Sequence, residues 1–92
     1  MAKSVIQNEK ECFVCKTTSN LHEHHIFFGN ANRKLSEKYG YKVWLCQAHH
    51  TGDNGVHFNR RLDLYLKAIA QVKFEQEHTR EDFIKTFGKS YL

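Results

Sequence analysis

The stretches Cys12-x-x-Cys15 and Cys46-x-x-His49-His50 decide the fold of this chain. Each stretch contains a pair of residues that commonly bind metal ions, with two residues between them, and about thirty residues separate the two stretches. Short chains build closed tetrahedral zinc sites from pairs with this spacing. Cys12, Cys15 and Cys46 are therefore predicted to bind one structural zinc ion, with either His49 or His50 as the fourth ligand. We favour His49, because it repeats the two-residue spacing of the first pair. Ordinary buried cysteines would leave the doubled spacing unexplained.

The composition indicates one small domain. The chain has 92 residues, including seven Phe, four Tyr and one Trp, and a formal net charge of +4 at pH 7. A domain of this size buries only about 60–70% of its unfolded surface, so a bound zinc ion would add stability that the core lacks. We expect residues 1–10 to form a flexible N-terminal arm and residues 11–92 to form a single zinc-binding domain.

Several features predict a cytoplasmic protein with a polyanionic partner. The odd number of cysteines argues against a disulfide framework, and the first residues lack the apolar core of a signal peptide. The sequence contains no run of about 18 apolar residues, so no membrane span is expected. The positive net charge suits a nucleic acid.

Hydrophobic patterns predict an α+β domain built on a two-stranded hairpin. Residues 20–28 and 41–45 are the predicted strands, since they contain aromatic and β-branched side chains. Gly29 and Gly40 bracket the segment between them, residues 30–39. This segment is expected to be either a single helical turn or an open loop.

A long helix is predicted to follow the hairpin, from about residue 56 to residue 78. Apolar residues recur there at three- and four-residue steps and define one buried face. Residues 51–55 contain two glycines, Asp53 and Asn54, a composition typical of a turn. Either Asp53 or Asn54 is expected to cap the helix.

A short C-terminal helix is predicted over residues 80–87. Thr79 and Asp82 have the spacing of a capping box, in which Asp replaces the usual Glu. Gly88 is expected to end this helix, since glycine adopts the left-handed conformation that often follows a last turn.

Four histidines remain after the zinc site is assigned: His24, His25, His50 and His57. A hairpin with a helix packed across it would bring their three locations together. Neighbouring residues of a strand point to opposite faces, so His24 and His25 would not both contact one ion without a local kink. One could bind a metal ion while the other takes a proton from water.

The pattern as a whole resembles that of a known family. Its parts are Cys12-x-x-Cys15, His24-His25-Ile26 and Leu45-Cys46-x-x-His49-His50. This string resembles the HNH nucleases, which have the ββα-metal fold, and more narrowly the small HNH-type proteins of phages and prophages. The resemblance covers most of the chain and implies a small zinc-stabilised ββα-metal domain, with a two-stranded hairpin, a long helix and a short C-terminal helix.

The resemblance also implies an activity and its residues. His24, His50 and His57 would hold a catalytic divalent ion such as Mg²⁺, Mn²⁺, Ni²⁺ or Zn²⁺, and His25 would be the general base. The expected function is that of a metal-dependent endonuclease that hydrolyses phosphodiester bonds of DNA, with nicking or weakly specific cleavage. The expected setting is the cytoplasm of a bacterial host cell, and other phage proteins are possible partners.

The chain departs from the family at the middle Asn of the motif. Tyr41 occupies the position where that Asn usually lies, about five residues before the second zinc pair. The Asn normally orients the general base through a hydrogen bond. Asn30, Asn32, Asn54 or Asn59 could replace it through space.

The basic segment between the predicted strands is the expected nucleic-acid contact. Its candidate residues are Arg33, Lys34, Lys38 and Lys42. Contacts of this kind make affinity fall with increasing salt concentration, although such residues more often form only a solvated face. Phe27 and Phe28 are expected to be core residues, because they end a strand and do not line an exposed sheet.

The alternative function is a non-catalytic zinc-binding module that docks on nucleic acid or on a phage protein. In that case His25 would donate a hydrogen bond to a backbone carbonyl group, and His57 would help to cap the long helix. His22 and His78 are expected to face solvent under either hypothesis.

Overall fold

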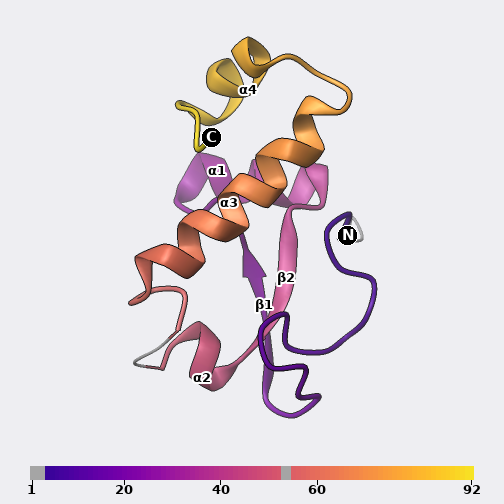
Figure 1. Ribbon diagram of the computed structural model, residues 1–92, viewed down its shortest axis with the longest axis vertical. Coiled ribbons are helices and arrows are strands. Elements are labelled where there is room, and N and C mark those ends of the chain that lie inside the picture. The colour runs from indigo at the N-terminus through magenta and orange to yellow at the C-terminus, as the bar shows by residue number, and fades with distance from the viewer. Residues whose placement is uncertain (1–3, 53–54) are drawn as a thin grey trace.

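A two-stranded antiparallel hairpin with helices along it forms the domain (Figure 1). The structure is a computed structural model, and it describes residues 4–52 and 55–92. The elements in chain order are β1 (Leu21–His25), α1 (Asn30–Tyr39), β2 (Lys42–Cys46), α2 (Gln47–His50), α3 (Arg60–Glu75) and α4 (Arg80–Phe87). The predicted α+β class, with a hairpin, a long helix and a short C-terminal helix, is confirmed.

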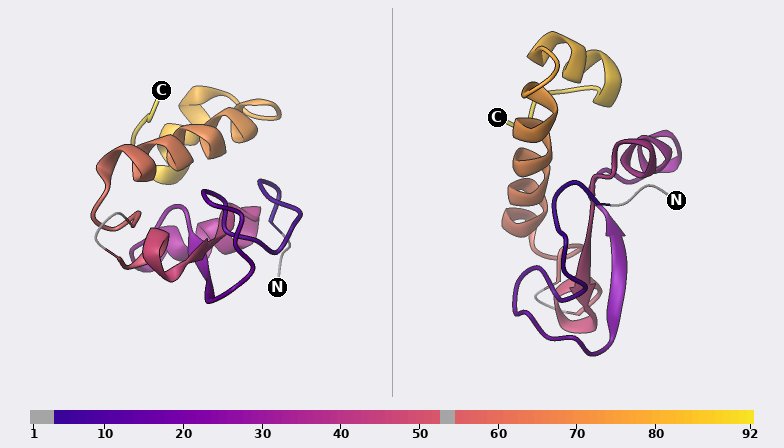
Figure 2. Two further views of the ribbon diagram at one scale, coloured as in Figure 1. Left: turned by 60° about the horizontal axis from the view of Figure 1, so that its bottom comes forward. Right: turned by 90° about the vertical axis from the view of Figure 1, so that its right-hand side faces the viewer.

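The helices occupy different parts of the hairpin. Helix α3 runs alongside the strands, while α2 lies near one end of them and α1 near the other (Figures 1 and 2). Helix α4 folds back beyond the C-terminal end of α3 (Figure 2). Within the described residues, no helix is both long and apolar enough to cross a membrane.

Strand β1 is shorter than predicted, whereas β2 has the predicted length and begins one residue later. Leu21 pairs with Cys46 and His25 pairs with Lys42, and the ladder of β1 ends there. The chain then bends inward, because Ser36 both accepts from the amide of Phe27 and donates to its carbonyl group. The two hydrogen bonds of this buried hydroxyl group connect the residues after β1 to α1.

The segment between the strands is a full helix of 10 residues, and its prediction as a single turn or an open loop was wrong. Leu35 and Tyr39 pack against the core, and Ser36 is fully buried. Gly40 ends the helix in the left-handed conformation, with φ of 75°, and its amide donates to Ser36. One buried side of α1 therefore provides stability that its polar sequence does not suggest.

The long helix is shorter than predicted at both ends. Helix α3 begins at Arg60, and the Asn59 side chain caps it by accepting from the amide of Leu62 at 3.2 Å. The two residues expected to cap it, Asp53 and Asn54, lie outside the described residues. The predicted C-terminal helix, its Thr79–Asp82 capping box and its end at Gly88 are confirmed.

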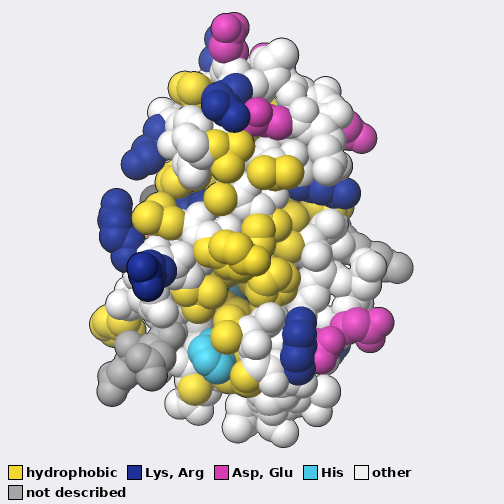
Figure 3. All heavy atoms as spheres, in the orientation of Figure 1, with side chains coloured by type: hydrophobic (Ala, Val, Ile, Leu, Met, Phe, Trp, Pro, Cys, Tyr) yellow, Lys and Arg dark blue, Asp and Glu magenta, His cyan; other side chains and the backbone are white. Residues whose placement is uncertain are grey.

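Aromatic side chains form the centre of the core. Phe27 is 1% exposed, and its ring centroid lies 4.4 Å from that of Phe87 in α4. The prediction that Phe28 also belongs to the core was wrong, since its side chain is 45% exposed. Apolar side chains also reach the surface over the middle of the α3 face, where Tyr65 and Val72 are more than half exposed (Figure 3).

The N-terminal segment from Ser4 onward lies against β2. The Ser4 hydroxyl donates to the carbonyl group of Lys42, and the amide of Val5 donates to Gly40 at 2.9 Å. The Gln7 side chain accepts from the amide of Trp44 at 2.8 Å. The described part of the expected arm thus covers the free edge of β2.

Candidate metal centres

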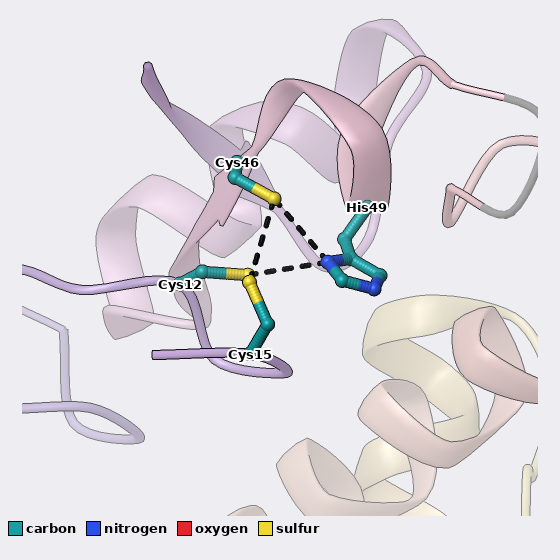
Figure 4. Close-up of side chains that lie close together, drawn as sticks. All are labelled: Cys12, Cys15, Cys46 and His49. Carbon is teal, nitrogen blue, oxygen red and sulfur yellow. Dashed lines mark hydrogen bonds between the residues drawn. The ribbon is translucent and has the colours of Figure 1, made fainter. Parts of the chain in front are cut away.

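Cys12, Cys15, Cys46 and His49 converge on one point. Their ligand atoms all lie within 4.8 Å of one another, and the side chains point toward one another from three parts of the chain (Figure 4). The Sγ atoms of Cys15 and Cys46 are 3.7 Å apart, which is far beyond a disulfide bond. This Cys3His group can bind a metal ion such as zinc. Of the two histidines that the sequence left open, His49 lies with the cysteines.

The distances match a tetrahedral ion. With Zn–S bonds of about 2.3 Å and Zn–N bonds of about 2.0–2.1 Å, neighbouring ligands are separated by about 3.4–3.8 Å. Nδ1 of His49 lies 3.7 Å from Sγ of Cys12 and 3.2 Å from Sγ of Cys46. The first separation lies in this range and the second is slightly shorter, so the group is close to the geometry that a tetrahedral ion requires.

Local backbone geometry positions these ligands. The amide of Cys12 donates to Thr17 at 2.8 Å, and the amide of Lys16 donates back to Cys12 at 2.9 Å, so the loop closes into a tight turn. A further bond from the amide of Phe13 to Trp44 attaches this turn to β2. Cys46 is the last residue of β2, and His49 follows within α2.

The electrostatics favour the thiolate at Cys12 and disfavour it at Cys15. Burial by itself would raise the pKa of the Cys12 thiol, but backbone hydrogen bonds at Cys15, Cys46 and Val14 outweigh it and lower that pKa to about 6. At Cys15, a backbone hydrogen bond from Thr17 lowers the pKa, but burial and the neighbouring thiols raise it more, so it lies above its usual value. Since metal ligands are deprotonated thiols, Cys12 is better prepared to bind an ion than Cys15.

A second group consists of His24, His50 and His57, whose ligand atoms also lie within 4.8 Å of one another. The Nε2 atoms of His50 and His57 are 3.3 Å apart. Interplanar angles between the three rings run from 59° to 85°, so the rings are not stacked face to face. Their nitrogen atoms are close enough together to bind one ion.

His24 is the buried member of this group. Its side chain is 3% exposed, and its Nε2 atom has no hydrogen-bond partner within residues 4–52 and 55–92. Burial, followed by the nearby His50 and His57, lowers the pKa of His24 to about 3. The ring is therefore neutral at physiological pH and keeps a lone pair for a ligand.

A tight loop brings His57 to His50. The amide of Val56 donates to His49 at 2.8 Å, which folds the chain back over α2. A Cβ atom at Gly55 would lie 2.7 Å from the backbone of His50, so only glycine fits there. His57 lies in this loop and not in the first turn of α3, contrary to the predicted helix boundary.

His25 lies in a third group, on the opposite face of β1. Its Nε2 atom is 2.9 Å from a carboxylate oxygen of Glu37 in α1 and 4.0 Å from one of Glu23. The expected general base is thus separated from the His24 group by the strand. The sequence did not single out Glu37, because its proximity to His25 depends on α1, which was not expected to be a full helix.

Lys42 supplies the positive charge of this third group. Its ammonium group lies 3.1 Å from Glu37 and 3.5 Å from Glu23, and the residue is 5% exposed. The expectation that Lys42 belongs to a solvent-facing basic surface was wrong, because packing under α1 buries it. His25 and Lys42 together lower the pKa of the Glu37 carboxyl group, with the hydrogen bond from His25 as the larger cause.

The other candidate cations remain on the surface. Arg33, Lys34 and Lys38 are exposed, and the first two line an open pocket together with His25 and Glu37. Phe28 lines the same pocket and also contacts the His24 group.

Two further histidines, His22 and His78, are exposed as predicted, and each also contacts another ring. His22 is exposed, as predicted, but its Nδ1 atom lies 3.0 Å from Nδ1 of His50. His78 is exposed and stacks on Phe74, with ring centroids 4.4 Å apart. Among the asparagines considered as a replacement for the missing motif residue, Asn59 is engaged as the cap of α3.

Comparison of the chain with models of protein families, with curated proteins and with solved structures finds no match.

Proposed function

We propose that this protein is a metal-dependent endonuclease that hydrolyses phosphodiester bonds of DNA. The observation that carries the proposal is the buried Nε2 atom of His24, which has no hydrogen-bond partner in the described parts of the chain and faces two more imidazoles. An unpartnered buried polar atom costs about 1–3 kcal/mol, so its retention indicates a ligand. His24, His50 and His57 would hold the catalytic divalent ion.

Imidazole ligands suit the borderline transition metals better than Mg²⁺, which prefers oxygen. Zn²⁺, Ni²⁺ and Co²⁺ are therefore the ions to test first, and Mn²⁺, which prefers oxygen ligands as Mg²⁺ does, comes after them. A divalent ion in such a site supplies positive charge that stabilises the reacting phosphate group and acidifies bound water.

His25 is the proposed general base. Its Nε2–H group donates to the Glu37 carboxylate at 2.9 Å, which leaves Nδ1 free to accept a proton from water. Glu37 thereby takes the orienting role of the Asn that the motif lacks. Lys42 holds the same carboxylate through two contacts of 3.1 Å and limits its movement.

The pocket beside His25 suits a phosphate backbone. Arg33 and Lys34 line it, and both are exposed. The same pocket contains Gly29, which precedes α1 without a side-chain cap from any described residue, so the amide groups of the first turn are available to an anion. These contacts recognise the backbone and not the bases, so cleavage is expected to be nicking or weakly specific.

The base and the metal group lie on opposite faces of one strand, at consecutive residues. Phe28 is close to both groups, since its ring is 6.1 Å from that of His24 and 5.6 Å from that of His57, and it lines the pocket of His25. Its side chain is 45% exposed. Cleavage by these residues would require one phosphate group to reach both the ion and His25 past this ring.

The proposal is tested by nicking of supercoiled plasmid DNA with each metal ion, for the wild type, His24→Ala and His25→Ala. Loss of a general base slows such reactions by about 10²–10⁴-fold, so His25→Ala should nick at a small fraction of the wild-type rate. Glu37→Gln should retain more activity than His25→Ala, since it keeps a hydrogen-bond acceptor. His78→Ala, which removes an exposed imidazole at the other end of α3, is the matched control and should cut normally.

The alternative is a zinc-binding module that docks on nucleic acid or on a phage protein without cleaving it. The separation of His25 from the His24 group favours this function. It predicts DNA binding that weakens with salt, with supercoiled DNA left intact by the wild type under every metal ion. Equal nicking by the wild type and both site variants would instead reject the assigned residues.

A further inference from the structure

His22 contacts the proposed metal group at the Nδ1 atom of His50, whereas His57 lies at the Nε2 atom of the same ring. His22 and His24 are alternate residues of β1, so their side chains leave the same face of the strand. The Nδ1 atom of His22 lies 3.0 Å from Nδ1 of His50, while Nε2 of His50 lies 3.3 Å from Nε2 of His57. The two nitrogen atoms of His50 therefore face different partners.

The chemistry of imidazole determines which nitrogen carries the proton. Two Nδ1 atoms 3.0 Å apart form a hydrogen bond only if one donates and the other accepts. A neutral imidazole has one N–H group and one lone pair, and a metal ion needs the lone pair. If Nε2 of His50 binds the ion beside His57, its proton is on Nδ1 and points at His22.

We propose that His22 is a positioning residue for the His24–His50–His57 metal site. It accepts the Nδ1–H group of His50 and so holds that ring with the lone pair of Nε2 directed at the ion. The inference rests on the metal site of the proposed function and assigns it a partner that no motif predicts. Hydrogen-bond partners of this kind orient ligating histidines and raise their basicity.

The geometry favours this role over direct ligation. The ligand atoms of His24, His50 and His57 lie within 4.8 Å of one another, and within the described residues His22 is not part of that group. The His22 and His50 rings meet edge to face, with an interplanar angle of 76° and centroids 5.1 Å apart. His22 therefore contacts His50 at Nδ1, and His57 contacts it at Nε2.

The test is a titration of Co²⁺ into protein that already contains one Zn²⁺ per chain, followed by visible absorption. Bands from thiolate-to-cobalt charge transfer would reveal any exchange at the Cys3His group, so the second site is observed separately. The variants are His22→Ala, which removes the acceptor, and His22→Asn, whose side-chain oxygen can replace Nδ1. His78→Ala is the control for the loss of an exposed imidazole.

We expect His22→Ala to weaken Co²⁺ binding by about 10–100-fold with an unchanged spectrum, and His22→Asn to recover most of this loss. Unchanged affinity of His22→Ala would overturn the inference, and so would an altered cobalt spectrum, which indicates that His22 is itself a ligand. If only the inference fails, the wild type still binds Co²⁺ and still nicks DNA. If the wild type binds no second ion and nicks no DNA, the proposed function fails and the inference fails with it.

Discussion

The buried side chain of His24 places a polar nitrogen atom where an apolar side chain would leave no hydrogen bond unmade. The side chain is 3% exposed, and the parts of the chain that the structure describes offer its Nε2 atom no partner. A leucine or phenylalanine there would avoid a penalty of about 1–3 kcal/mol. The neutral, unpaired ring is instead suited to bind a metal ion.

Tyr41 occupies the place of the motif Asn but is a core residue. It is 4% exposed, and its ring stacks on that of Tyr39 with centroids 5.7 Å apart. A buried phenol of this kind does not orient His25. Burial, followed by the nearby Tyr39 and Glu77, raises the pKa of Tyr41 to about 12.

This raised pKa predicts a loss of stability in alkali. A tyrosine with the ordinary pKa of 10.0 ionises near pH 10 in the unfolded chain, and folded Tyr41 ionises near pH 12. Between these values unfolding releases a proton, so stability that is complete below about pH 10 is lost as pH rises to 12, by about 2–3 kcal/mol. In denaturant unfolding, the free energy of unfolding of Tyr41→Phe should decline less than that of the wild type between about pH 10 and about pH 12. Tyr65→Phe, which changes an exposed ring, should follow the wild type. Equal declines for all three proteins would contradict the assignment.

At the level of elements, α2 and the loop after it join the two metal groups. His49 and His50 are neighbours in α2, one beside the cysteines and the other beside His24 and His57. The loop returns over α2 through the bond from the amide of Val56 to His49. A shift of this loop therefore moves ligands of both groups.

Gly55→Ala is expected to disturb this arrangement. Its Cβ atom would lie 2.7 Å from the carbonyl group of His50, and overpacking of this kind costs about 1–3 kcal/mol. Co²⁺ affinity at the second site should fall by about tenfold, since second-site geometry tolerates little displacement. Thr51→Ala, an exposed position of the same loop, is the control. Wild-type cobalt affinity in Gly55→Ala would show that the loop adapts.

The elements also differ in how far their sequences predict them. Helix α4 was predicted with both ends, because Thr79, Asp82 and Gly88 supply its capping within the segment itself. Helix α1 was not predicted in full, since its stability comes from packing of Leu35 and Tyr39 against distant residues. Local signals thus locate α4, whose ends are set by its own capping residues, and they miss the full length of α1, whose buried side becomes apparent only in the folded chain.

In the molecule as a whole, the Cys3His group and the aromatic core support opposite ends of the hairpin. The aromatic core joins the end of β1 to α1, α3 and α4. The cysteines and His49 join the N-terminal turn to β2 and α2 (Figure 4). At that end, an ion bound by the Cys3His group would add a constraint to the burial of residues such as Leu45 and Val56.

Removal of the ion should therefore destabilise the domain. Structural zinc contributes apparent binding free energies of about 10–16 kcal/mol, so a strong chelator is expected to lower the melting temperature sharply and to reduce the circular dichroism signal. Added Zn²⁺ should restore both. Cys15→Ser should resemble the chelated protein, whereas Val14→Ser, at an exposed position of the same turn, should not. A chelated protein with the wild-type melting temperature would refute a structural role.

The sequence by itself determined the three cysteines of the Cys3His group, the hairpin and the C-terminal helix, because ligand spacing, strand composition and capping residues act over short distances along the chain, while the structure selected His49 over His50. Only the tertiary structure decided that Glu37 meets His25, that Lys42 is buried and that His22 reaches His50. These contacts depend on the register of β1 against β2 and on the packing of α1. A shift of one residue in that register would reverse the faces of every side chain in β1.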